Sequence, residues 1–317
     1  MARHSPVMRA ARVHRFGGPE AIGIEDLPVP EPGPGEVLIR VGAAGVGPWD
    51  GWIRAGKSVL PQPLPLTLGS DLAGTIEAVG QGVAGFHAGE PVFGVTNKRF
   101  TDAYADFASA RAEMIAHRPD TLDEVAAASV PVIAVTAWQA LFDQARLVAG
   151  ETVLIHGAAG SVGAYAVQLA RRAGLHVIAT AAAQDADHVY RLGAMTVVDY
   201  RTDRFETVAR DVDAVIDLVG GETQARSFAV LKRGGRLVSA VSNPDQETAA
   251  RCGVEAKFFL VDVTTAVLRE IGDRLARREL VTDVGLVLPL SEVRVAHEML
   301  DGDRPKPRGK MVIRMDG

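Results

Sequence analysis

The stretch Thr152 to Ala170, TVLIHGAAGSVGAYAVQLA, most constrains how this chain can fold. It joins a short β-branched apolar run to a glycine-rich turn and an alanine-rich helical pattern. Strand, tight turn and helix open a nucleotide-binding βαβ unit, whose turn points backbone N–H groups at a phosphate. We expect Gly160 to let the backbone approach a pyrophosphate and Gly163 to let the helix pack closely on the strand. Ala158 replaces the first glycine of the usual G-x-G-x-x-G, so the turn alone indicates either a dinucleotide site or a structural turn.

Strand and helix patterns alternate after this turn. Each strand pattern is a short apolar run, and most of the intervening segments have helical periodicity. Such alternation predicts an α/β fold with a doubly wound parallel sheet of Rossmann type, which favours the dinucleotide site over a structural turn. The expected strands cover 152–155, 176–180, 196–200, 214–220, 236–241 and 257–261, and the expected helices cover 187–192, 205–210 and 223–231.

The first 120 residues predict a different, mostly β domain, because short alternating runs are broken by glycines and prolines. A helical pattern begins near Thr121, which we expect to be its N-cap. Two helix and two strand patterns between Val267 and Met315 are expected to return to the β domain. The predicted boundaries are 1–124 and 264–317 for a substrate domain, and 125–263 for the nucleotide-binding domain.

Composition excludes several function classes. The 317 residues carry a formal net charge of −5, which gives no general attraction to nucleic acid or anionic membrane. Cys252 is the single cysteine, so an intramolecular disulfide is impossible and a cysteine-based zinc site is excluded. No apolar run approaches the length of a membrane span, and the N-terminus has no secretory pattern, so we expect a cytoplasmic protein.

Nearly the whole sequence resembles the medium-chain dehydrogenase/reductase superfamily, and within it the zinc-independent NADPH:quinone oxidoreductase (zeta-crystallin-like) family. The resemblance implies a GroES-like substrate domain beside the Rossmann domain. It also implies a homodimer that extends the nucleotide-domain sheet, for which the run FFLVDV is a suitable edge strand. The segments that carry the resemblance are FGGPE, VPEPGPGEVLIRV, AAGVGPWD, LGSDLAGTIEAVG, VTAWQAL, VLIHGAAGSVG, RLGAMTVVDY, LKRGGRLV and GKMVIRM.

The resemblance also places the catalytic zinc ligands of the metal-dependent members. Their cysteine, histidine and glutamate correspond to Gly47, Ser70 and Asp71. Two of the three ligand types are therefore gone, and Cys252 lies too far along the chain to replace the thiolate. Because a catalytic zinc needs three protein ligands and an open position, we expect chemistry without a metal.

Metal-free chemistry favours reduction over alcohol oxidation, because nothing replaces the metal's stabilisation of an alkoxide. Reducing an electrophilic acceptor needs only an aimed hydride, with protonation by water or a nearby acid. Quinones and activated C=C bonds of enones or alkenals are such acceptors, and the resemblance implies the same NADPH-dependent oxidoreductase. Two alternatives stay open: an NADPH-binding protein with little catalysis, and an enoyl-thioester reductase.

The second strand of the nucleotide domain ends in TAAA, with no carboxylate until Asp185. NAD sites carry an acidic residue here for the ribose 2′-hydroxyl, so its absence favours NADPH. In related NADPH-dependent proteins a tyrosine follows the third strand, and Tyr200 matches it with Arg201 adjacent; the alternative is a strand-end aromatic and a solvated charge. Phe258 and Phe259 fit a nicotinamide contact and a core position equally well. The expected cofactor contacts are Trp52, Ala159, Gly160, Ser161, Val162, Gly163, Thr180, Tyr200, Arg201, Gly221, Ser239, Ala240, Val241, Phe258, Phe259 and Leu260.

The substrate side is expected in the loop GVGPWDGWIR, which holds Trp49 and Trp52, two of the three tryptophans. Aromatic rings near a hydride donor suit a flat apolar acceptor, although either indole also fits the edge of the domain core. We interpret Asp50 as a loop hydrogen-bond acceptor and His156 as a strand-end histidine. The sequence identifies no catalytic acid or base.

Overall fold

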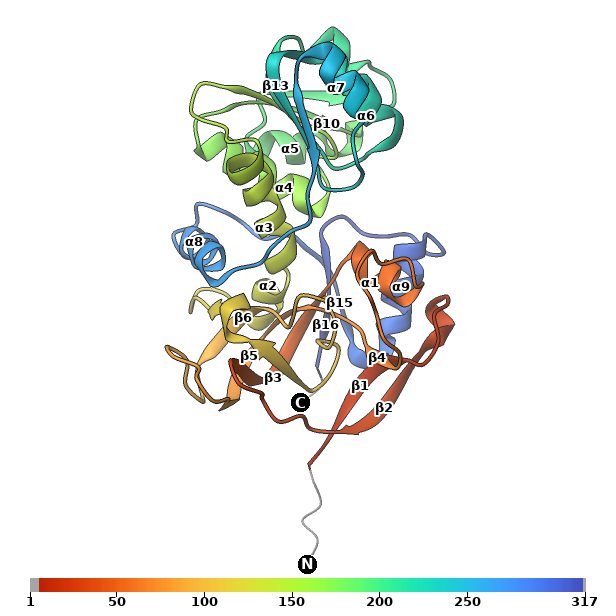
Figure 1. Ribbon diagram of the computed structural model, residues 1–317, viewed down its shortest axis with the longest axis vertical. Coiled ribbons are helices and arrows are strands. Elements are labelled where there is room, and N and C mark those ends of the chain that lie inside the picture. The colour runs from red at the N-terminus through yellow and green to blue at the C-terminus, as the bar shows by residue number, and fades with distance from the viewer. Residues whose placement is uncertain (1–5, 316–317) are drawn as a thin grey trace, which may run out of the picture. The chain divides into compact units, whose positions relative to one another are not determined.

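The computed structural model describes residues 6–315. The chain divides into two compact units. Unit 1 comprises Met1–Val132 and Val263–Gly317, and unit 2 comprises Ile133–Asp262. The middle of the chain therefore forms one unit, and the two ends form the other (Figure 1).

Unit 1 contains two sheets. In the smaller, antiparallel one, β1 (Val7–Val13) lies between β2 (Ile22–Pro28) and β4 (Leu66–Thr67). The larger sheet has the order β15-β16-β3-β5-β6-β8, with β7 also paired to β3. The last two strands of the chain thus complete a sheet begun by the first hundred residues. Its strands are β3 (Glu36–Val46), β5 (Asp71–Val79), β6 (Pro91–Val95), β7 (Phe107–Arg111), β8 (Ile115–His117), β15 (Val284–Pro289) and β16 (Lys310–Arg314).

The helices of unit 1 correct two expectations. The first helix after the β-strands is capped by Asp123, not Thr121, because the Asp123 carboxylate accepts the N–H of Ala126 at 2.7 Å. Unit 2 begins at 133, later than the expected 125, because that helix packs on β3 and β5. The helices are α1 (Pro48–Arg54), α2 (Glu124–Ala128), α8 (Thr265–Ala276) and α9 (Val293–Asp301), with 3₁₀ turns η1 (Pro19–Ala21), η2 (Ala112–Met114) and η7 (Leu290–Glu292).

Unit 2 is a six-stranded, fully parallel sheet with the order β11-β10-β9-β12-β13-β14. This order is that of the doubly wound dinucleotide-binding fold, so the predicted fold class is confirmed. The order reverses between β9 and β12, where this fold binds its ligands at the carboxyl ends of the strands. The strands are β9 (Thr152–Ile155), β10 (His176–Ala181), β11 (Thr196–Asp199), β12 (Val212–Asp217), β13 (Leu231–Ser239) and β14 (Glu255–Phe258).

The helices of unit 2 pack on this sheet, α4 against β9 and β10, α5 against β10 and β11, and α7 against β14. Apolar side chains between the layers, such as Leu154, Val215 and Leu237, are fully buried. The elements are α3 (Pro131–Trp138), which begins in unit 1, α4 (Ser161–Arg172), α5 (Ala186–Leu192), α6 (Gly221–Ser227) and α7 (Gln246–Cys252), with a π-helical turn η3 (Gln139–Gln144) and 3₁₀ turns η4 (Ala183–Asp185), η5 (Phe205–Thr207) and η6 (Phe228–Val230).

Two expected elements of unit 2 are shorter in the structure. The helix expected at 205–210 is only the turn η5, where the Thr207 hydroxyl bonds the Arg204 carbonyl at 2.7 Å and so competes with helix propagation. The strand expected at 257–261 ends at Phe258, so most of the run FFLVDV lies outside it. β14 is nevertheless the last strand in the sheet order, as an edge strand must be.

Candidate functional site

The glycine turn of unit 2 connects β9 to α4 and has the form of an anion cradle. Gly157 has φ +69°, and Gly160 is the N-cap of α4 in an extended conformation. Within the described residues no side chain caps α4, so its first N–H groups are available to an anion. A Cβ on Gly160 would meet only the Gly157 carbonyl at 3.2 Å, whereas a Cβ on Gly163 would lie 2.2 Å from that oxygen. Gly163 is therefore required for packing, and Gly160 leaves the approach to the helix N-terminus open.

A buried network under the turn holds its shape. The Ser227 hydroxyl donates to the Thr223 carbonyl at 2.6 Å, so it accepts from His156 Nε2 at 3.0 Å. His156 Nδ1 is then the acceptor for the Thr180 hydroxyl at 3.1 Å, and the Gly157 N–H approaches that hydroxyl at 3.4 Å. Burial lowers the pKa of His156 to about 4, which keeps the ring neutral, as this arrangement requires.

Thr180 was expected to contact the cofactor, but its polar groups face the protein. Its side chain is buried, its hydroxyl serves the His156 network, and its carbonyl accepts the Ala158 N–H at 3.1 Å. Thr180 thus fixes the glycine turn to β10 from below. A strand-end threonine gives no sequence pattern that distinguishes this role from a ligand contact.

Asp217 organises the carboxyl ends of β12 and β13, and the sequence interpretation missed it. Its fully buried carboxylate accepts the N–H groups of Val219 (3.0 Å) and Gly220 (2.8 Å), the Gln224 amide (2.8 Å) and the Ser239 hydroxyl (2.9 Å). An aspartate that ends an apolar strand just before a glycine pair is an Asx-turn pattern, which could have identified it.

The predicted contacts near these ends divide into buried and exposed groups. Ser239 is fully buried, and its oxygen also accepts the Val241 and Ser242 N–H groups at 3.2 Å each, so it shapes the loop. Ala240 follows it, and Gly221 begins α6. Phe259 is buried and donates its N–H to the Ser239 carbonyl at 3.2 Å, which supports a core position for its ring. Val241 and Leu260 are 39% and 55% exposed and face outward.

Gln139 is a second positioning residue that the sequence did not identify. Its side-chain amide donates to the Asp262 carbonyl at 2.8 Å and accepts the Asp262 N–H at 3.1 Å. It lies in the π-helical turn η3, a rare geometry that is frequent near functional sites. This two-point contact fixes the end of the segment Phe259–Asp262, which follows β14.

Tyr200 and Arg201 stand together at the end of β11. The Tyr200 side chain is 59% exposed, its N–H bonds the Ala181 carbonyl at 3.3 Å, and the Arg201 guanidinium lies 5.7 Å from its ring centroid. The Arg201 N–H is fixed by Asp199 Oδ1 at 3.0 Å. The pair therefore presents a cation and an aromatic edge beside the end of β10, where a ribose 2′-substituent would lie in this fold.

In unit 1 the two tryptophans of the expected substrate loop have different environments. Trp52 is 51% exposed. Trp49 is half-buried, packs against the core, and donates its Nε1–H to Ser70 Oγ at 3.1 Å. Of the two alternatives for each indole, Trp49 therefore fits the core edge, and Trp52 remains the candidate for a substrate contact.

Asp50 is a buried hydrogen-bond acceptor, as expected, but it lies in the first turn of α1 and not in a loop. Its Oδ2 accepts the Gly47 N–H at 2.8 Å and the Tyr104 hydroxyl at 2.9 Å, while Oδ1 has no hydrogen-bond partner among residues 6–315. Burial raises the pKa of Asp50 to about 7. A carboxyl with one unpartnered buried oxygen is well suited to carry a proton there.

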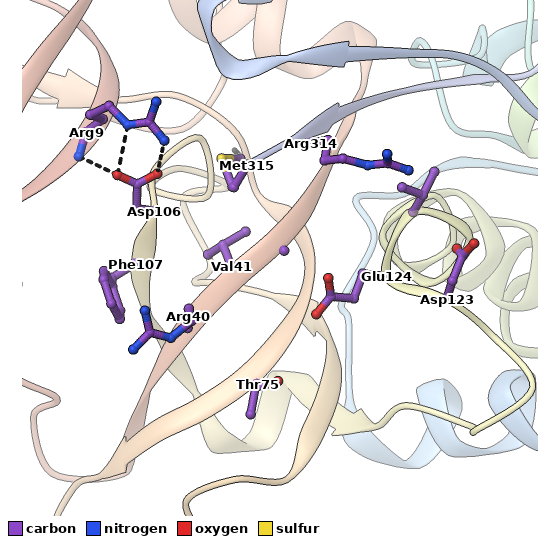
Figure 2. A pocket seen from close by; sticks show the side chains of 12 residues that line it. Arg9, Arg40, Val41, Thr75, Asp106, Phe107, Asp123, Glu124, Arg314 and Met315 are labelled. Carbon is purple, nitrogen blue, oxygen red and sulfur yellow. Dashed lines mark hydrogen bonds and ion pairs between the residues drawn. The ribbon is translucent and has the colours of Figure 1, made fainter. Parts of the chain in front are cut away.

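A surface pocket of about 620 Å³ in unit 1 is not the candidate site. None of the predicted site residues lines it. Figure 2 shows that Arg9, at this pocket, forms a two-point pair with Asp106, and Arg40 lies over the Phe107 ring. Over the part of the chain that the structure describes, no three His, Cys, Asp or Glu side chains are placed to hold a metal ion. Among the same residues, no helix is long and apolar enough to span a membrane.

Comparison with known proteins finds dehydrogenase relatives that match residues of both units. A family model described as an alcohol dehydrogenase GroES-like domain matches residues 33–120, and one described as a zinc-binding dehydrogenase matches residues 192–313. Human quinone oxidoreductase is 33% identical over 331 aligned positions, which cover 99% of both chains. This chain belongs to the quinone oxidoreductase family of the medium-chain dehydrogenase/reductases. It is accordingly an oxidoreductase of a nicotinamide-dependent dehydrogenase superfamily.

Solved structures agree. A quinone oxidoreductase from Coxiella burnetii superposes with a TM-score of 0.91 at 31% identity, covering 98% of this chain and all of the other. The mycobacterial protein Rv1454c complexed with NADPH superposes with a TM-score of 0.85 at 32% identity, covering 97% and 99% of the two chains. The predicted superfamily and the GroES-like character of unit 1 are confirmed.

Proposed function

We propose that this protein is an NADPH-dependent reductase that transfers hydride to a quinone or to the activated C=C bond of an enone or alkenal. The observation that carries the proposal is the cradle at Gly157–Gly163, which has an uncapped helix N-terminus and no side chain at Gly160. The names of the relatives support the acceptor class. The bound nicotinamide would supply the hydride, and the acceptor would take its proton from water or an acid.

The preference for NADPH rests on two features of unit 2. No carboxylate stands between the end of β10 and Asp185, so nothing there repels a 2′-phosphate. Tyr200 and Arg201 offer that phosphate a cation and a hydroxyl. The NADPH complex of the mycobacterial relative supports the same choice. Titration of intrinsic fluorescence with both cofactors tests it, and a lower Kd for NADH than for NADPH would reject it.

The residues named above then have distinct tasks. The α4 N-terminus would bind the pyrophosphate, while Asp217 and Gln139 hold the loops that orient the nicotinamide ribose and ring. Trp52 would stack on the acceptor. We also propose a homodimer in which β14, the edge strand of the sheet, pairs with its copy, and sedimentation equilibrium would test this.

The decisive experiment is NADPH oxidation with a panel of quinones, enones and enoyl thioesters, each repeated with NADH. Turnover of quinones or enones supports the proposal. Tight NADPH binding without turnover on any acceptor would instead identify a binding protein, and turnover confined to thioesters would identify an enoyl reductase.

The role of Trp52 is tested by Trp52→Ala, which we expect to lower kcat/KM for the acceptor about 10-fold or more while the Kd for NADPH changes less. Val59→Ala removes another exposed apolar side chain from unit 1 and should change neither value. Equal losses of turnover and NADPH binding in Trp52→Ala would contradict a substrate contact.

A further inference from the structure

The superfamily includes zinc-binding dehydrogenases, so we tested whether the metal position of this chain could accept an ion. The corresponding residues are Gly47, Ser70 and Asp71, at the end of β3 and the start of β5. The strand register brings them together, because Gly45 pairs with Asp71. Ser70 and Asp71 are fully buried. Whether an ion fits depends on what occupies the space between the three positions.

The indole of Trp49 fills the space at Gly47. A Cβ built on Gly47 would lie 2.3 Å from two carbon atoms of the Trp49 six-membered ring, so no cysteine thiolate could project there. The Nε1–H of the ring donates to Ser70 Oγ at 3.1 Å, which favours this orientation. One side chain thus closes two of the three ligand positions.

Lys310 closes the third position. Its Nζ lies 3.0 Å from Asp71 Oδ2, and both side chains are almost completely buried, at 2% and 0% exposure. Asp71 Oδ1 accepts the Val132 N–H at 3.1 Å, so both carboxylate oxygens are engaged. The same ammonium sits 4.4 Å from the centroid of the Trp49 ring, within cation–π distance.

We propose that the Trp49–Lys310 pair fills the metal position, and that the Lys310 ammonium is the permanent cation of this chain in place of zinc. The residues present do not fit a catalytic zinc, which needs three ligands and an open coordination site. The ammonium supplies the positive charge that buried Asp71 requires, and the indole supplies volume and a π-face. This inference concerns unit 1 alone and does not depend on the identity of the acceptor.

The proposal predicts that zinc cannot replace the Lys310 ammonium, because the Trp49 ring still closes two of the three ligand positions when the lysine is removed. The experiment compares the melting temperatures of the wild type, Lys310→Ala and Lys310→Ala/Asp71→Asn, each with Zn²⁺ and with EDTA. Lys310→Ala should melt lower than the wild type, and the added Asp71→Asn change should recover part of that loss, because it removes the unpaired buried charge. Zinc should not raise the melting temperature of Lys310→Ala by more than it raises that of the other two proteins. Zinc bound by exposed histidines such as His87 would shift all three proteins alike.

Two outcomes of this experiment would overturn the proposal. One is a wild type that is purified with one zinc per chain and loses stability in EDTA. The other is a Lys310→Ala variant that melts at the wild-type temperature, or one that zinc stabilises more than it stabilises the other two proteins. Because none of these measurements uses NADPH or an acceptor, they can fail while the proposed reductase activity stands, and the reverse holds too.

A second measurement keeps the test valid if Lys310→Ala does not fold. Gly47→Ala should lower the melting temperature in the wild type, because the new methyl group meets the Trp49 ring. In a Trp49→Ala background the same substitution should cost much less, because the ring is gone. An equal loss in both backgrounds would mean that Trp49 does not occupy this position, and the proposal would be wrong.

Discussion

His156 is predicted to make unit 2 sensitive to mild acid. Its two ring nitrogens are committed to Thr180 and Ser227, and the ring is completely buried against Phe205. A proton on Nδ1 would face the Thr180 hydroxyl as a second donor and would place an unpaired charge in the core. The pKa of His156 therefore falls from 6.5 to about 4, chiefly because of burial.

The size of the effect follows from this pKa difference. Between pH 6.5 and pH 4 the unfolded chain holds a proton at His156 that the folded chain does not hold. The free energy of unfolding therefore falls as the pH falls, by about 1.4 kcal/mol per pH unit. Integrated between pH 7 and pH 5, the loss from His156 alone is roughly 2 kcal/mol.

The assay is urea unfolding, followed by circular dichroism at pH 7 and pH 5, of the wild type and His156→Gln. Glutamine can donate to Ser227 and accept from Thr180 but does not titrate, so the variant should lose about 2 kcal/mol less than the wild type over this interval. Asp50, with its pKa raised to about 7, changes stability in the opposite direction, because its proton is lost from the folded state as the pH rises. That contribution is common to both proteins and cancels in the comparison. Parallel losses in the two proteins would refute the assignment.

Further substitutions test the turn, the loops and the buried pair. Gly163→Ala should destabilise the protein by about 1–3 kcal/mol or more in urea unfolding, because its Cβ would lie 2.2 Å from a carbonyl oxygen. Gly160→Ala should change stability by less than about 1 kcal/mol but weaken NADPH binding in a fluorescence titration. Asp217→Ala should leave buried donors unpaired, lose about 1–3 kcal/mol or more, and raise the Kd for NADPH. Lys310→Met should lose about 3–5 kcal/mol in thermal or urea unfolding, and Lys310→Met/Asp71→Asn clearly less, since breaking a buried pair leaves a charge alone.

Local patterns predicted the parts of the fold that depend on neighbouring residues. The alternation of apolar runs and helical periods after Thr152 predicted six strands and their parallel direction. The element ends were less predictable, because they depend on single competing bonds. Asp123 replaces Thr121 as the cap of α2, and the Thr207 hydroxyl limits the expected helix to one turn. Periodicity carries no information about such bonds.

In the candidate site, too, some residues could be predicted from local sequence patterns and others could not. Gly160 and Gly163 were predicted from their spacing, because a tight turn followed by a helix needs glycine at those places. The supporting residues Asp217 and Gln139 were not found, because each acts on backbone groups that only the folded chain brings within reach. Thr180 was assigned to the cofactor because position alone cannot show which way a hydroxyl points.

At the metal position, the sequence shows that the zinc ligands are missing, but it does not show which group takes the place of the zinc. The missing ligands can be read directly at Gly47 and Ser70, but the replacement cation is 239 positions away from Asp71 in the sequence. Lys310 reaches Asp71 because β16 pairs antiparallel with β3, and the pairing of Met311 with Val46 sets Lys310 opposite Gly47, the N-cap of α1. A one-residue slip in this register would turn the lysine to the other face of the sheet and leave Asp71 buried without a counter-charge. The Lys310–Asp71 ion pair therefore favours the correct register of β16. This last strand completes the larger sheet of unit 1 and also supplies the positive charge that buried Asp71 needs.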